Sequence, residues 1–168
     1  TYNISSQGSA RKYFHDASNG QYNPQFDVIG PVTVSNNMSY YGKNDSYGND
    51  MYADKMVSEA CKLADTEFDV DFTQYDNDND GYVDFVFVIY AGYGEADGGA
   101  STTIWPHSWN LLSAGTQCKV DGKTVDLYAC GNELDFYSKK HTGIGTFCHE
   151  FSHVLGLPDL YVTNTSSH

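Results

Sequence analysis

The chain has 168 residues, of which 40% are hydrophobic and 15% aromatic, and this is enough for one domain with a packed core. Its 22 acidic residues against nine basic ones give a formal net charge of −13. That charge disfavours nucleic acid and anionic membranes as partners, because both need a basic surface. The longest apolar run, residues 85–91, is only as long as a strand, so we expect no transmembrane segment.

The start of the chain predicts one helix followed by an extended segment. The helix is expected over residues 8–18, with Ser9 or Ser6 as its N-cap. Residues 26–35 have the composition of a strand. Gly30-Pro31 interrupts them, however, and indicates an edge strand or a bulge.

The middle of the chain predicts a second helix, a strand and a hairpin. Apolar residues recur at helical spacing over residues 51–64, and Asp50 is the expected cap of that helix. Residues 82–91, rich in β-branched and aromatic side chains, predict a buried central strand. Asp121-Gly122 is typical of a hairpin turn. Because helices and strands alternate irregularly, we expect an α+β domain with one twisted, mixed sheet.

The four cysteines do not form a recognisable metal-binding pattern, because no two of them are spaced as CxxC. If both bonds form, they allow three disulfide pairings. The register of the predicted hairpin places Cys118 opposite Val125, so a Cys118–Cys130 bond would need an irregular hairpin. The four cysteines are Cys61, Cys118, Cys130 and Cys148.

An acidic turn, DNDNDGYVD at residues 76–84, directly precedes the predicted central strand. Oxygen-bearing residues at alternate positions of a tight turn converge in the way that a hard cation such as calcium needs. The twelfth position is Phe87 instead of glutamate, so the turn is not an EF-hand. The alternative is a solvated acidic turn. The expected calcium ligands are Asp76, Asp78, Asp80, the Tyr82 carbonyl and Asp84.

The string HEFSHVLGLPD at residues 149–159 carries the strongest signal for chemistry. It lies on a predicted helix over residues 143–155, with Thr142 as the expected cap. His149 and His153 fall on one side of that helix, opposite its apolar residues, with Glu150 on their flank. Paired histidines of this kind bind zinc, and the glutamate activates a bound water.

A third ligand is expected shortly after the helix. Gly156 allows a left-handed turn that ends the helix and reverses the chain. Asp159 can then return to the metal that His149 and His153 hold. Two histidines and one carboxylate leave the fourth position of a zinc ion open, as catalysis requires.

These motifs resemble the immune inhibitor A family of secreted bacterial metalloproteases, which are metzincin-like peptidases in the variant with aspartate as third ligand. The stretches that carry the resemblance are residues 9–32, residues 76–99, IWPHSW at 104–109 and HEFSHVLGLPDLY at 149–161. The resemblance implies a metzincin-like catalytic domain, export from the cell, zinc, and in many members calcium. It also implies protein or peptide substrates and allows for a propeptide.

Carried over residue by residue, the resemblance assigns His149, His153 and Asp159 as zinc ligands and Glu150 as the general base. His107 lies in a matching segment, where packing, hydrogen bonding or substrate binding are all open roles. Metzincins carry a methionine below the zinc, downstream of the third ligand, whereas the three methionines here lie upstream. We therefore expect residues 1–168 to be a single catalytic domain that is incomplete at both ends.

Two other functions compete with the endopeptidase. One is a cell-surface binding module whose metals are structural, although Glu150 would have no purpose there. The other is a zinc hydrolase of small substrates, which would need a deep pocket in place of a long groove.

Overall fold

The computed structural model describes residues 8–159. Over that range the chain forms four α-helices and six strands, and this confirms the predicted α+β class. No helix within the same range is both long and apolar enough to cross a membrane. The helices are α1 (Ala10–Ala17), α2 (Met38–Tyr41), α3 (Ala53–Phe68) and α4 (Ile144–Val154), with short 3-10 helices η1 (Phe72–Tyr75) and η2 (Glu95–Asp97). The strands are β1 (Tyr82–Val83), β2 (Val86–Tyr93), β3 (His107–Asn110), β4 (Cys118–Val120), β5 (Lys123–Val125) and β6 (Leu127–Leu134).

Two three-stranded mixed sheets form among these residues, so the expectation of one sheet is wrong. In the larger sheet, β6 lies between β2, which is parallel to it, and β3, which is antiparallel to it. In the smaller sheet, β5 lies between β1 and β4. The predicted strand 82–91 divides between the two sheets at Asp84, whose backbone N–H donates to the carbonyl of Tyr75.

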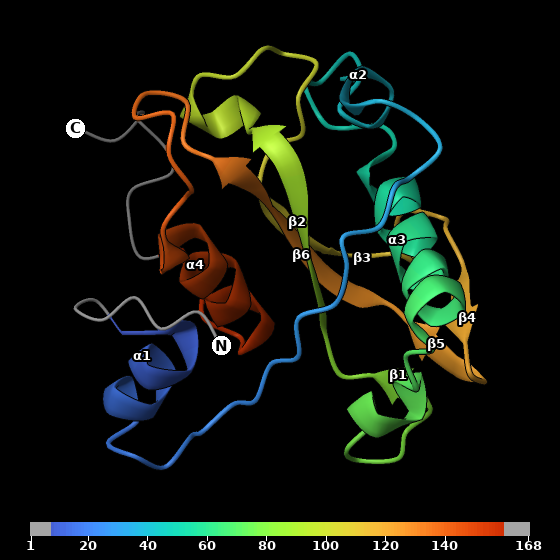
Figure 1. Ribbon diagram of the computed structural model, residues 1–168, viewed down its shortest axis with the longest axis vertical. Coiled ribbons are helices and arrows are strands. Elements are labelled where there is room, and N and C mark those ends of the chain that lie inside the picture. Colours follow the sequence, from blue (N-terminus) through green and yellow to red (C-terminus); the bar gives the residue numbers. More distant parts are fainter. Residues whose placement is uncertain (1–7, 160–168) are drawn as a thin grey trace.

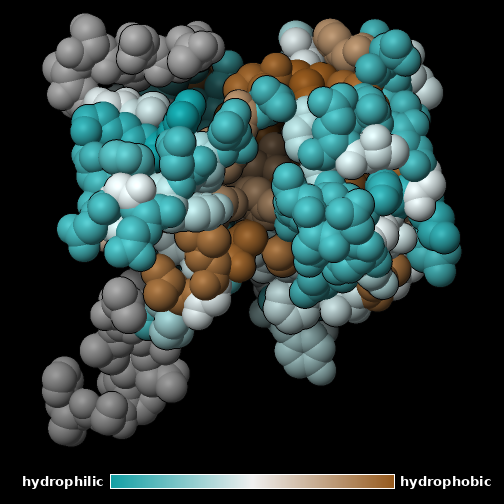
Figure 2. All heavy atoms as spheres, turned by 90° about the horizontal axis from the view of Figure 1, so that it is seen from below, coloured by the Kyte–Doolittle hydropathy of each residue, from teal (hydrophilic) through white to brown (hydrophobic). Residues whose placement is uncertain are grey.

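The larger sheet stands between α4 on one side and α3 on the other (Figure 1). Tyr90 of β2 belongs to the core shared with α3, whereas Phe87 contacts Phe147 of α4 with ring centroids 4.6 Å apart. The molecule has two halves, one with α1 and α4 and the other with α3 and the smaller sheet, and apolar side chains gather between them (Figure 2). Within residues 8–159 the central strand is β6, and Ile89 of β2 is 63% exposed, so the prediction of a buried central strand at 82–91 is wrong.

The helix starts were predicted with mixed success. Ser9 caps α1 by accepting a hydrogen bond from the backbone N–H of Lys12, as expected, while Ser6, the alternative, lies outside the described residues. Asp50 does not cap α3, because its carboxylate accepts the backbone N–H of Trp105 at 2.8 Å instead. That hydrogen bond joins the start of α3 to the segment before β3.

Residues 26–35 form no strand in the described structure, contrary to expectation. They run as an extended segment between the two halves of the molecule (Figure 1). Gly30 has a φ of +116° and Pro31 lacks an N–H, so neither fits a regular ladder. The hairpin prediction is confirmed: Asp121 and Gly122 have positive φ, and Cys118 pairs with Val125.

Candidate metal centre

The site begins with α4, which starts one residue later than the sequence suggested. Gly143 is its N-cap, and the expected cap Thr142 instead accepts a hydrogen bond from the side chain of Asn132 at 3.1 Å. The other partners of the Asn132 amide include Asp97 and the carbonyl of Leu134. Thr142 therefore ties the start of α4 to the end of β6.

One face of α4 is held by aromatic packing. The ring of Phe151 lies 5.0 Å from that of Phe14 in α1 and 5.2 Å from that of Phe85, which directly precedes β2. Phe147 contacts Phe26 at 5.1 Å. These edge-on and tilted contacts are the favourable arrangements of aromatic pairs. They fix the rotation of α4 and so decide where its opposite face points.

Three ligand-type side chains converge on that opposite face. The Nε2 atoms of His149 and His153 are 3.2 Å apart. Oδ1 of Asp159 lies 3.5 Å from the first and 3.4 Å from the second. Neighbouring ligands on a tetrahedral zinc ion, with bonds of about 2.0–2.1 Å, are separated by roughly 3.3 Å. The three atoms therefore have the spacing that one metal ion requires.

The turn after α4 brings Asp159 back to the histidines. Gly156 has a φ of +86°, in the left-handed region. Its N–H donates to the carbonyl of His153, and the N–H of Leu157 donates to that of Ser152. This pair of bonds is the Schellman arrangement that ends helices at glycine.

The same turn orients one of the histidines. Nδ1 of His153 lies 2.9 Å from the carbonyl oxygen of Leu157, which can only accept, so Nδ1 carries the proton. Nε2 of His153 therefore keeps its lone pair and faces Asp159 and His149. A backbone carbonyl behind a ligating imidazole is the usual outer partner in metal sites. Sequence reasoning missed this role of Leu157, although the position of Gly156 could have indicated it.

Glu150 is the buried member of the group, with 6% of its surface exposed. Thr146, one turn earlier, lies against Gly131 of β6, so this side of α4 faces the sheet. Burial raises the pKa of Glu150, and protonated His149 and His153 would act in the opposite direction. A buried carboxylate with a raised pKa, next to paired imidazoles, is suited to act as a general base and then as a general acid.

His107 belongs to a hydrogen-bond network on the other side of the sheet. Its Nδ1–H donates to the carbonyl of Trp105 at 2.6 Å, and its Nε2 accepts from the Tyr128 hydroxyl at 2.9 Å. Burial lowers its pKa, which favours the neutral ring that these two bonds need. His107 pairs in register with Cys130, which lies in the core shared with α3. Of the roles left open by the sequence, this geometry favours hydrogen bonding.

The acidic turn gathers part of the expected ligand set. One carboxylate oxygen from each of Asp76, Asp78 and Asp84 lies within 4.8 Å of the others. The carboxylate of Asp80 instead accepts the N–H of Tyr82, which begins β1.

Asp76 has further partners that the sequence did not reveal. Its carboxylate accepts the N–H groups of Asp80 and Gly81, and the ammonium of Lys123 lies 2.5 Å away. Lys123 holds the pKa of Asp76 below its usual value. No local pattern could have found Lys123, because it lies on β5, 47 residues further along the chain.

Comparison with known proteins identifies the family of this chain. Residues 2–168 match the family described as "Immune inhibitor A peptidase M6, catalytic domain". The chain belongs to this family. It is 31% identical over 183 residues to immune inhibitor A from Bacillus thuringiensis subsp. alesti, an alignment that covers 94% of this chain and 26% of that protein. It is 30% identical over 177 residues to the pre-pro-metalloprotease PrtV of Vibrio cholerae serotype O1, covering 92% of this chain and 19% of PrtV.

The chain thus spans about a quarter of the length of that immune inhibitor A and about a fifth of the length of PrtV. Membership in this peptidase family implies a metal. Among residues 8–159, the cluster of His149, His153 and Asp159 offers imidazole nitrogens for such an ion, while the cluster in the acidic turn offers oxygens alone.

Proposed function

We propose that this chain is the catalytic domain of an exported bacterial zinc endopeptidase. The observation that carries the proposal is the convergence of His149, His153 and Asp159 at 3.2–3.5 Å, with the buried Glu150 next to His149. Family membership supports peptide hydrolysis as the reaction class. The metzincin-like architecture belongs to the same proposal, and α4 packed on a mixed sheet is compatible with it.

The donor set favours zinc over the other common metals. Two imidazole nitrogens and one carboxylate oxygen suit zinc, whereas calcium and magnesium prefer oxygen ligands alone. Three protein ligands leave a fourth position for water or substrate. When bound there, zinc polarises a carbonyl group and makes a coordinated water more acidic.

In this proposal Glu150 acts first as the general base and then as the general acid of the reaction. As a carboxylate it accepts a proton from the attacking water, and it later gives that proton to the nitrogen of the departing amine. Its burial favours both steps, because a raised pKa brings the acid and base forms closer in energy near neutral pH. His153, oriented by the Leu157 carbonyl, would hold the metal in a fixed position relative to Glu150.

The substrate would lie along a strand edge. β3 pairs with β6 on one side, and α4 packs close to both strands. An extended peptide can add to such an edge through backbone hydrogen bonds, which suits protein substrates of varied sequence. PrtV is named a pre-pro enzyme, and we include in the proposal a propeptide that covers this site before activation.

The acidic turn is the second metal site of the proposal. Asp76, Asp78 and Asp84 would bind a structural calcium ion that fixes the path from η1 into β1 and β2. The carboxylate of Asp80, also predicted as a ligand, would have to turn from the N–H of Tyr82 towards the ion, and the Tyr82 carbonyl stays part of the proposed ligand set. Lys123 competes for Asp76, so the affinity for calcium should be modest.

The test compares this protein with its Glu150→Gln variant, which keeps the size of the side chain but removes the base. The control is Glu67→Gln, an exposed position on α3. We expect all three proteins to bind about one zinc per chain, with casein cleavage reduced by roughly 10²- to 10⁴-fold in Glu150→Gln alone. If the unmodified protein binds zinc and cuts no peptide, the metal is structural and the binding-module alternative holds. If zinc does not bind, the assignment of the ligands is wrong.

A further inference from the structure

Two cysteines that are 57 residues apart in sequence meet in the larger core. Cys61 of α3 is 3% exposed and Cys118 of β4 is fully buried. The Cys118 sulfur lies 3.7 Å from the carbonyl oxygen of Ser58, one turn before Cys61 on the same helix. The neighbouring Cys118 raises the pKa of the Cys61 thiol, and Cys61 in turn lowers the pKa of Cys118, so Cys118 is the more acidic of the two.

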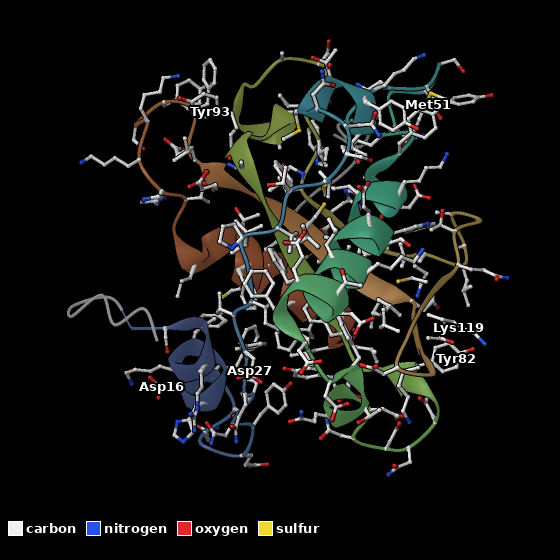
Figure 3. All side chains as sticks on the ribbon, turned by 45° about the vertical axis from the view of Figure 1, so that its right-hand side comes forward. Asp16, Asp27, Met51, Tyr82, Tyr93 and Lys119 are labelled. Atoms are coloured by element: carbon white, nitrogen blue, oxygen red, sulfur yellow. The ribbon has the colours of Figure 1, made fainter. Side chains whose placement is uncertain are left out.

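The strand geometry aims Cys118 at α3. Successive residues of β4 alternate between the two faces of the sheet, so Cys118 and Val120 are buried while Lys119 between them is exposed. Figure 3 shows Lys119 pointing away from the molecule on the side opposite α3. The contact between Cys61 and Cys118 therefore follows from the register of the hairpin.

The other two cysteines lie elsewhere. Cys130 is on β6, where its sulfur is 3.6 Å from Nδ1 of His107. Cys148 is on α4, in the separate cluster with Phe14 and Phe151. Cys61 and Cys118 are consequently the pair that the fold places in contact.

A hollow of about 420 Å³ opens over the seam between α3 and the start of β4. Its lining includes Ser58 and Lys62, on either side of Cys61 along α3, and Thr116 and Gln117, just before Cys118. A hollow of this size is large enough for one end of a small disulfide reagent. The positive charge of Lys62 favours the thiolate of Cys118 next to it.

We propose that Cys61 and Cys118 form a disulfide bond when the protein meets a disulfide oxidant such as oxidised glutathione. The Cys118 thiolate attacks one sulfur of the oxidant and displaces the first thiolate of the reagent, leaving a mixed disulfide. Cys61 then loses its proton and attacks the Cys118 sulfur, and the second thiolate of the reagent leaves. Two protein thiols are oxidised to one disulfide, while the oxidant is reduced to two thiols.

The bond would fasten α3 to β4 and enclose the chain segment that contains the acidic turn, β2 and β3. This proposal can be tested independently of the proposed peptidase activity, because α4 and the metal-ligand candidates next to it lie outside that segment. An exported protein meets oxidising conditions in which such bonds persist.

The experiment equilibrates the protein with oxidised glutathione, denatures it without reduction, alkylates free thiols and maps the peptides by mass spectrometry. We expect Cys130 and Cys148 to be alkylated and Cys61 and Cys118 to be recovered in one cross-linked peptide. Cys130→Ala combined with Cys148→Ala should keep the cross-link, whereas Cys61→Ser should leave Cys118 as a mixed disulfide with glutathione, because no second thiol resolves it. The oxidised protein should also melt at a temperature roughly 10 °C higher than the reduced one.

Alkylation of Cys61 and Cys118 after oxidation of the unmodified protein would overturn the proposal, as would a bond between any other pair. Because that measurement needs no variant, a failure of Cys61→Ser to fold would not affect it.

Discussion

Gly156→Ala tests whether the turn after α4 delivers Asp159 to the metal. The added Cβ would meet no atom within 4 Å, so the substitution costs backbone energy alone. The φ of +86° is unfavourable for alanine by about 1–2 kcal/mol. Leu155 and Leu157 around the turn are 44% and 51% exposed, so little packing opposes its relaxation when no metal is bound. We therefore expect most of the cost to appear as zinc affinity weaker by roughly 5- to 30-fold.

The assay is a competition titration of zinc against a chelating dye, together with thermal unfolding of the metal-free protein. The control is Gly145→Ala, in the first turn of α4, where a Cβ also meets nothing within 4 Å and φ is not positive. That variant should bind zinc normally and be more stable by up to about 1 kcal/mol. If Gly156→Ala binds zinc as tightly as the unmodified protein and unfolds at the same temperature, the turn does not carry Asp159 and the reasoning is refuted.

Three further substitutions have effects that follow from the structure. Burial raises the pKa of Asp50 to about 6, so the native state binds more protons than the unfolded state between about pH 4 and 6 and loses stability as pH rises through that range. Asp50→Asn should therefore stabilise the protein at pH 8 by about 1 kcal/mol, after allowance for partial exposure, and have little effect at pH 4 in denaturant unfolding. Lys123→Met removes the cation beside Asp76, so calcium affinity measured by calorimetry should rise roughly tenfold; unchanged affinity would mean that calcium does not use Asp76. Gly42→Ala would place a Cβ within 2.6–2.8 Å of backbone atoms of residues 102–104, and the free energy of unfolding should fall by about 2–3 kcal/mol; a fall below about 0.5 kcal/mol would show that this contact relaxes freely.

The sequence predicted best where structure depends on near neighbours. The hairpin at Asp121-Gly122 and its pairing of Cys118 with Val125 follow from a two-residue turn with positive φ at both positions. The N-cap at Ser9 depends on a hydrogen bond that spans three residues. The facing positions of His149 and His153 are set by helical spacing alone.

Predictions failed where a distant partner competes with a local one. Asp50 looked like a cap, but the N–H of Trp105, 55 residues later, takes its carboxylate. The apolar stretch at 82–91 predicted one central strand. The backbone N–H of Asp84 instead donates to the carbonyl of Tyr75, and the strand divides at that point. Hydrophobicity alone could not show that β6, which contains Cys130 and Gly131, is the strand that two others pair with.

A contact between Phe85 and Phe151 connects the two clusters of ligand-type side chains through the fold. The acidic turn ends at Asp84, and the next residue, Phe85, packs its ring 5.2 Å from that of Phe151. Phe151 directly follows Glu150 on α4, so the path of the chain out of the turn fixes the aromatic contact that orients the helix. A cation that holds Asp84 would consequently stabilise the side of α4 opposite the histidines without touching them. If a cation binds in the acidic turn, we expect it to act on the site through this aromatic packing, without contact with His149.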